Sequence, residues 1–347
     1  MRAHGECLAG LHAGCSALSW STDDGKHLFA RSLDFTGLTE GSRVTFVPRG
    51  TVYDICSGRS SAFRARYAAV GIGLLLEQPV LYEGINERGL MGAQLYYRGF
   101  AHFARTARVG TQAIQPPMVV YHLLAQCESV EQVVNLLSHE LTPTAVPMMG
   151  TVPPLHWMFT DRTGESIVVE PDADGLHIYR NTVGVMTNSP SYPWQRLNLL
   201  CYAGIRDLDY GALQLCGDRL EACFSGSGAQ GLPGDWSAPA RFVRLCFLRE
   251  YGCKGSDEGS GVARLFRLMD SAAFPLGMVR VTEGGEADEA YDYTIYTAVM
   301  CAESGRFYWT TYENQSIQYV DLTSLCERDS PKQFTLAMTP DFRARTP

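Results

Sequence analysis

Hydrophobic and polar residues alternate along much of the first hundred positions, which is the pattern of half-buried β-strands. The expected strands cover residues 17–20, 27–33, 43–47, 67–75 and 90–97. Asp23-Asp24-Gly25 separates the first two, and Asp-Gly between two alternating segments is a strong hairpin signal. Residues 83–89 are expected to form another turn. Strands that follow one another through tight turns indicate an antiparallel sheet.

Beyond residue 115 the hydrophobic period lengthens to that of amphipathic helices, which are expected over residues 116–127 and 130–139. Ser129 followed by Gln132 fits a capping box at the start of the second helix. The later elements are strands over residues 156–160, 166–170, 293–302, 306–312 and 317–321, and helices over residues 241–251 and 261–269. Because strands and helices fall into separate blocks, without alternating strand–helix units, we predict a layered α+β fold.

The 347 residues are 46% hydrophobic, and no linker, charge block or internal repeat marks a domain boundary. One compact domain is therefore expected. The formal net charge is −8 and no basic stripe interleaves with aromatic residues, which argues against a nucleic-acid partner. No run of the sequence approaches the ~20 apolar residues of a membrane span, so no membrane partner is expected.

The eleven cysteines are spread along the chain and include no C-x-x-C pair. This pattern favours reduced thiols and a cytoplasmic location over disulfides or a zinc site. Gly71-Ile-Gly73 lacks the third glycine of a dinucleotide fingerprint, and residues 225–231 lack the ending of a phosphate loop. No metal and no organic cofactor are expected.

Cys15 follows a leader, residues 1–14, that has no apolar core of the about 7–15 residues that a secretory signal requires. We interpret the leader as a propeptide that is removed, and residues 15–347 as a single amidohydrolase domain. Cys15 would then carry both a thiol, with an unperturbed pKa near ~8.5, and an α-amine, near ~8. One residue would thus supply nucleophile and base, the pattern of an N-terminal nucleophile amidohydrolase.

Cys15, Arg31, Asp34 and Asn188, the last in Thr-Asn-Ser-Pro, together resemble the choloylglycine hydrolase family. Further matching segments are residues 155–170, 231–242 and 311–315, so the resemblance covers nearly the whole chain. It implies the four-layer αββα sandwich of the N-terminal nucleophile hydrolases and a homotetramer. It also implies a small-molecule amide as substrate, either a conjugated bile salt or penicillin V.

The resemblance assigns a role to each matching residue. Arg31 would lie beside the sulfur, where a fixed cation favours the thiolate. Asp34 would accept a hydrogen bond from the α-amine and fix its direction. Asn188 would donate its side-chain amide to the oxyanion, a contact that can be worth ~3–4 kcal/mol. Arg241, near the start of an expected helix, would join the polar network around the nucleophile.

Tyr96 departs from the bile salt hydrolases, which typically have asparagine at this position, and matches the penicillin V acylases, which typically have tyrosine. The family uses the backbone N–H of this residue in the oxyanion hole, so the change alters the pocket wall and leaves the donor in place. An aromatic wall suits a phenoxy or other acyl group. The sequence therefore leans toward penicillin V acylase activity.

Three alternatives stay open on the sequence alone. The chain could be an acyl-homoserine lactone acylase, or a non-catalytic ligand-binding protein that retains its leader. It could also be a hydrolase with an internal cysteine and His27 or His156 as base. The leader is itself a departure, because many relatives begin Met-Cys, whereas Gly14 precedes Cys15 here. Glycine offers little steric hindrance to autocatalytic attack by the thiol on the preceding carbonyl.

Overall fold

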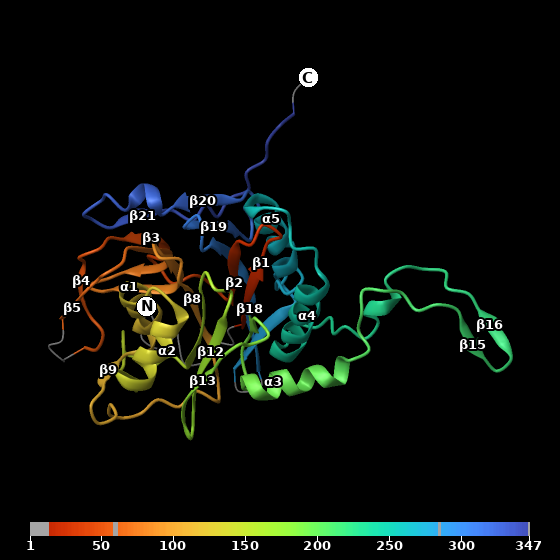
Figure 1. Cartoon of the computed structure of the whole chain (residues 1–347), viewed down its shortest axis with the longest axis horizontal. Helices are drawn as coiled ribbons and strands as arrows, with labels where there is room; N and C mark the ends of the chain where they lie inside the picture. The colour runs from red at the N-terminus through yellow and green to blue at the C-terminus, as the bar shows by residue number, and fades with distance from the viewer. Residues whose placement is uncertain (1–13, 58–61, 284–285, 346–347) are drawn as a thin grey trace.

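Two large antiparallel sheets lie face to face, and helices cover the outer face of each (Figure 1). This computed structural model describes residues 14–57, 62–283 and 286–345. The prediction of an α+β fold built as a four-layer αββα sandwich is confirmed. Most of the leader, residues 1–13, lies outside the described residues.

The first sheet carries Cys15 and has the strand order β14-β1-β2-β18-β19-β20, with β17 paired to β18. Its strands are β1 Gly14–Ser21, β2 His27–Phe35, β14 Val185–Met186, β17 Val279–Glu283, β18 Glu286–Cys301, β19 Arg306–Thr311 and β20 Gln318–Asp321. The hairpin expected from Asp-Gly joins β1 to β2 and sets Cys15 opposite Leu33 and Ala17 opposite Arg31. Cys15 and Arg31 are therefore diagonal neighbours on one face of the sheet.

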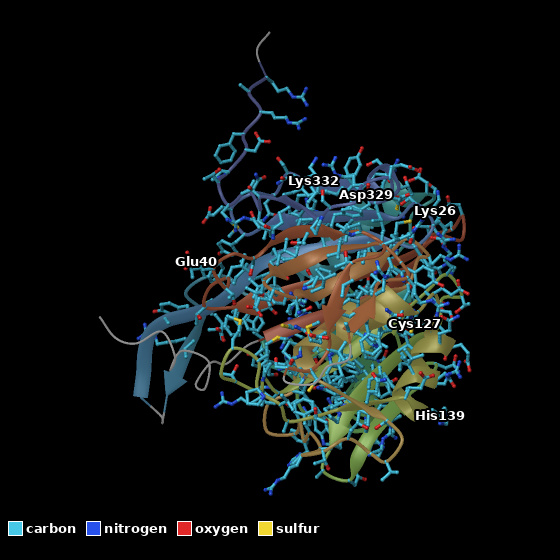
Figure 2. The ribbon with its side chains drawn as sticks, turned by 90° about the vertical axis from the view of Figure 1, so that its left-hand side faces the viewer. Lys26, Glu40, Cys127, His139, Asp329 and Lys332 are labelled. Atoms are coloured by element: carbon cyan, nitrogen blue, oxygen red, sulfur yellow. The ribbon has the colours of Figure 1, made fainter. Side chains whose placement is uncertain are left out.

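The second sheet has the order β13-β12-β11-β8-β7-β6-β3-β21. Its strands are β3 Arg43–Val47, β6 Ala69–Leu75, β7 Pro79–Asn86, β8 Met91–Tyr96, β11 Leu155–Thr160, β12 Ser166–Asp172, β13 Gly175–Tyr179 and β21 Lys332–Phe334. In the view of Figure 2, Lys332 on β21 and His139 at the end of α2 lie near opposite ends of the molecule.

The turn expected over residues 83–89 is wrong in its first half, because residues 83–86 continue strand β7. Gly84 misled the prediction, since it lies opposite Gly71 in the sheet and a Cβ there would sit 2.7 Å from the carbonyl oxygen of Val70. Glycine is needed at this position for close approach of the strands and not for a turn. The turn itself ends at Gly89, whose φ of 88° favours glycine.

The helices divide between the two sheets. Helices α1 (Val119–Gln126) and α2 (Val130–His139) enclose the core on the outer side of the second sheet. Helices α4 (Ala238–Tyr251) and α5 (Glu258–Asp270) pack on β1 and β2 of the first. Only half of the expected capping box forms at α2: the Ser129 side chain accepts from the Gln132 N–H, but Gln132 accepts from Glu128 and not from Ser129.

The remaining elements are short and connect or extend the sandwich. They are α3 Tyr192–Asn198, the 3-10 turns Pro116–Met118, Leu199–Tyr202, Ser227–Ala229 and Thr323–Leu325, and the strands β4 Val52–Asp54, β5 Ala62–Arg64, β9 Gln112–Ile114, β10 Leu141–Pro143, β15 Leu213–Leu215 and β16 Asp218–Leu220. The segment 203–236, with the β15–β16 hairpin at its end, projects from the body as an arm (Figure 1). Among the described residues no helix is long and apolar enough to cross a bilayer.

Candidate active site

Cys15 lies near the start of β1 with its side chain between the two sheets, where it is 1% exposed. Arg31 reaches across from the adjacent strand, and its Nη2 donates to Cys15 Sγ at 3.5 Å. Burial raises the pKa of the Cys15 thiol, while the positive charges of Arg31 and Arg241 act in the opposite direction. The thiol therefore has a fixed cation beside it, in the position that the family resemblance implies for Arg31.

Asn188 and Arg241 hold the backbone of Cys15 from the other side. The Cys15 N–H donates to Asn188 Oδ1 at 2.9 Å, and Arg241 Nη1 donates to the Cys15 carbonyl at 2.6 Å. Arg241 Nη2 also donates to Asn188 Oδ1 at 2.7 Å, so the two side chains fix each other. Arg241 comes from the first turn of α4, where it is 2% exposed.

Asp34 is fully buried on β2 and is opposite Gly14 in the sheet. Its Oδ1 accepts from the Thr294 hydroxyl at 2.5 Å, whereas its Oδ2 has no hydrogen-bond partner and lies 3.9 Å from Arg241 Nη1. Burial raises the pKa of Asp34 to about 6, against the opposing effect of Arg241. The Cys15 N–H donates to Asn188 and not to Asp34.

Gly14 is buried and closely surrounded. A Cβ at this position would lie 2.5 Å from the Phe274 ring and 3.3 Å from the Asp34 Cβ. Position 14 therefore requires glycine because there is no room for a side chain. This is a stronger constraint than the low steric hindrance to attack by the thiol that the sequence indicated.

Tyr96 lies between two cavities that border the neighbours of Cys15. The first, of about 160 Å³, has largely apolar walls that include Leu33, Phe35, Leu38, Met148, Met149 and Leu155, with Arg31 at one side. The second, of about 310 Å³, is lined by Gly14, Asn188, Arg241 and Asp292 among others. Tyr96 borders both, and its ring packs at 5.8 Å from that of Phe35.

The backbone of Tyr96 faces Asn188. Tyr97 N–H donates to the Pro154 carbonyl at 2.7 Å, so β8 uses Tyr97 and not Tyr96 to bond to the neighbouring strand at this point. Adjacent residues of an antiparallel strand direct their backbone groups to opposite sides. The Tyr96 carbonyl accepts from Asn188 Nδ2 at 2.8 Å, which places the Tyr96 N–H on the same side.

Neither histidine that the sequence left as a possible base contacts Cys15. His156 is 1% exposed and bonds to Glu170 at 3.3 Å and to the Thr187 carbonyl at 2.9 Å. His27 pairs with Glu303 at 2.9 Å near the surface. The hypothesis of an internal cysteine with a histidine base has no support from this geometry.

Comparison with known proteins agrees with this arrangement. Residues 15–334 match the family model described as linear amide C–N hydrolases, choloylglycine hydrolase family. The chain belongs to this family. It is a linear amide C–N hydrolase, and the resemblance drawn from its sequence is confirmed.

Curated relatives in the family include two enzymes described as bile salt hydrolase/transferase. The one from Clostridium perfringens is 33% identical over 313 residues, 89% of this chain and 92% of that protein. The one from Lactiplantibacillus plantarum is 31% identical over 310 residues, again 89% and 92% of the two chains.

Solved structures give the same result. A mutant of the conjugated bile acid hydrolase from Clostridium perfringens superposes with a TM-score of 0.86 and 30% identity, covering 96% of this chain and 100% of that one. Penicillin V acylase from Agrobacterium tumefaciens has a TM-score of 0.71 and 19% identity, covering 92% and 90%, and supports the fold alone.

Several buried polar residues around Cys15 in this member of the choloylglycine hydrolase family were not identified from the sequence. Tyr296 and Glu83 contact Arg31, while Thr294 bonds to Asp34. Asp292 is 1% exposed, lines the second cavity, and has no partner for Oδ1. One signal was available: polar residues at positions 292, 294 and 297 interrupt the part of β18, residues 290–301, that is otherwise apolar.

Proposed function

We propose that this protein hydrolyses the amide bond of conjugated bile salts, with Cys15 as the nucleophile after removal of the leader. One observation carries the proposal: a single residue has its thiol on Arg31, its nitrogen on Asn188 and its carbonyl on Arg241, beside an apolar cavity. The bile salt hydrolases among its relatives supply the substrate class.

In the proposed mechanism, the α-amine of mature Cys15 accepts the thiol proton and the thiolate attacks the amide carbonyl. The Tyr96 N–H and the second hydrogen of Asn188 Nδ2, whose first hydrogen bonds to the Tyr96 carbonyl, stabilise the oxyanion in this mechanism. The amine then returns the proton to the leaving nitrogen. Water hydrolyses the resulting thioester, which releases the acid and regenerates the thiol.

Asp34 orients the α-amine in this mechanism. Support comes from its unpartnered Oδ2 and from its place opposite Gly14, which bring a free carboxylate oxygen to the position where the new amine appears. A buried carboxylate without a partner is costly, and a neighbouring ammonium removes that cost.

Penicillin V is the second candidate substrate, and Tyr96 is the observation that favours it. The ring borders the apolar cavity and packs near Phe35, so a phenoxyacetyl group would meet two aromatic faces. A long acyl chain from an acyl-homoserine lactone would use the same apolar walls and is the third substrate class to test.

The arm, residues 203–236, supports the proposal of a homotetramer. Leu213, Leu215, Leu220 and Phe224 are all exposed on it, and a small hairpin held away from the body has little core of its own. Exposed apolar side chains of this kind mark interaction surfaces. Sedimentation velocity of the intact protein and of a variant shortened across residues 212–222 would measure the contribution of the arm.

The decisive experiment combines intact mass with a hydrolysis panel. Purified protein is weighed to establish whether residues 1–14 have been lost, and is then assayed on glycocholate, taurocholate, penicillin V and a long-chain acyl-homoserine lactone. We expect the mass of a chain that begins at Cys15, and release of glycine from glycocholate or taurine from taurocholate. The Gly14→Val variant is the matched control. Its added side chain has no room beside Phe274, so this variant should fail to lose the leader. Turnover by protein that retains the complete leader would contradict the proposed base.

A further inference from the structure

Glu83 is a carboxylate placed in the space between the two sheets. It lies in the middle of β7 and is 0% exposed. Its Oε1 has no hydrogen-bond partner, and its Oε2 lies 3.0 Å from Arg31 Nη1. The ion pair therefore joins the second sheet to the first, immediately behind the residue that contacts the Cys15 thiol.

Tyr296 completes a chain of contacts that ends at the sulfur. Its hydroxyl accepts from Arg31 Nη1 at 2.6 Å and donates to Glu83 Oε2 at 3.0 Å. The other arm of the same guanidinium, Nη2, donates to Cys15 Sγ and, at 3.4 Å, to the Gln94 carbonyl. Arg31 thus divides its donors between an anion on one side and the nucleophile on the other.

We propose that Glu83 is a positioning residue that sets how much positive charge Arg31 presents to the Cys15 thiol. The inference rests on the proposed role of Cys15 as nucleophile. An ionised Glu83 offsets the charge of Arg31 and so reduces the stabilisation of the thiolate, while its contact keeps the guanidinium in line with the sulfur. Glu83 therefore orients the Arg31 guanidinium but makes the Cys15 thiolate less stable.

The groups around Glu83 agree with this function. Arg31 from β2 and Tyr296 from β18 act on it directly, Tyr82 adjoins it along β7, and Cys15 and Asp34 act on Arg31. Burial raises the pKa of Glu83 to about 7, with Arg31 opposing the rise. The charge of Glu83 therefore changes near neutral pH.

The test is the rate of Cys15 alkylation by iodoacetamide as a function of pH, followed by mass mapping of the Cys15 peptide. Glu83→Gln keeps an acceptor for Arg31 and Tyr296 but removes the charge. We expect the midpoint to move to lower pH and the rate at pH 8, where Glu83 of the parent protein is ionised, to rise about threefold to tenfold, equivalent to ~0.5–1 pKa unit. Glu83→Asp, which keeps the charge, should leave the midpoint in place.

Superimposable curves for Glu83→Gln and the parent protein would overturn the inference, because loss of a purely structural contact leaves the thiol pKa unchanged. If Glu83→Gln does not fold, Glu83→Asp decides, since a midpoint shifted to lower pH despite the retained charge would also overturn it. The readout needs no substrate. Parent protein that hydrolyses nothing in the panel, together with a shifted Glu83→Gln curve, would reject the proposed function and support this inference.

Discussion

Asn86 and Glu83 are buried polar residues three positions apart on β7, and they differ in how completely their polar atoms are hydrogen-bonded. Asn86, at the end of the strand, uses its whole amide: Nδ2 donates to the Leu124 and Cys127 carbonyls at 2.7 Å each, and Oδ1 accepts from the Arg88 and Leu90 N–H groups at 3.0 Å each. Glu83, in the middle, has one carboxylate oxygen with no partner.

The same contrast holds for the regions around them. The turn after β7 is tied to the end of α1 by fully paired neutral groups. The space between the sheets instead holds unpartnered buried atoms of charged side chains, on Arg31, Asp34, Glu83 and Asp292. Complete pairing stabilises a structure, whereas buried charge left partly unpaired is costly and is found where chemistry requires it.

The largest expected effect comes from replacing Cys15, the proposed nucleophile. Cys15→Ser should lower kcat/KM about 10³-fold or more, because a hydroxyl is poorly deprotonated by an amine with a pKa near ~8. The melting temperature should stay within about 2 °C, since the substitution is nearly isosteric. Steady-state kinetics and thermal melts test both statements, and activity within tenfold of the parent would count against Cys15.

Asn86→Ala should have the opposite effect, a large loss of stability with little change in activity. Four hydrogen bonds are lost and two buried carbonyls and two N–H groups lose their partner, so we expect the free energy of unfolding to fall by about 3 kcal/mol or more. The kcat/KM of the folded fraction should change less than about twofold. Urea unfolding and kinetics at 20 °C provide the comparison, with Asn86→Asp as the intermediate variant. A large loss of kcat with unchanged stability would show that the two regions are not separable.

Tyr96→Asn should change selectivity and not overall activity. The backbone N–H survives the substitution, but an aromatic contact worth ~0.5–1.5 kcal/mol beyond burial is removed. We expect the ratio of kcat/KM for penicillin V to that for glycocholate to fall roughly threefold to tenfold. An unchanged ratio would identify Tyr96 as a core residue that does not touch the acyl group.

The smallest effect is expected for Asp292, whose pKa is raised to about 7 by burial and by the nearby charge of Asp34. An unfolded aspartate has a pKa near ~3.9, so between about pH 4 and 7 the folded state binds the additional proton and stability declines as the pH rises. Asp292→Asn should reduce the fall in melting temperature between pH 5 and pH 8 by about 2 °C. Asp218→Asn, on the exposed arm, is the control and should leave that fall unchanged.

Sequence reasoning identified the residues that share a hairpin better than those that meet across sheets. The Asp-Gly turn predicted the hairpin that brings Cys15 and Arg31 to one face of the sheet, although the position of Arg31 beside the sulfur came from the family resemblance. Tyr96, Asn188 and Arg241 came only from the family resemblance, because each lies on a different element. Glu83 and Tyr296 escaped notice, since their proximity to Arg31 depends on how the two sheets pack, which no local pattern records. The tetramer, leader removal and substrate lean stay predictions.

The crowding around Gly14 has a consequence for any mutational scan of this protein. Position 14 would score among the least tolerant in the chain, although it supplies no functional group and is absent from the proposed mature enzyme. A chain begun as Met-Cys15, trimmed by methionine aminopeptidase, would bypass that requirement altogether. Comparing a mutational scan of the full chain with a scan of the Met-Cys15 chain would separate residues needed to form the mature enzyme from residues needed for catalysis.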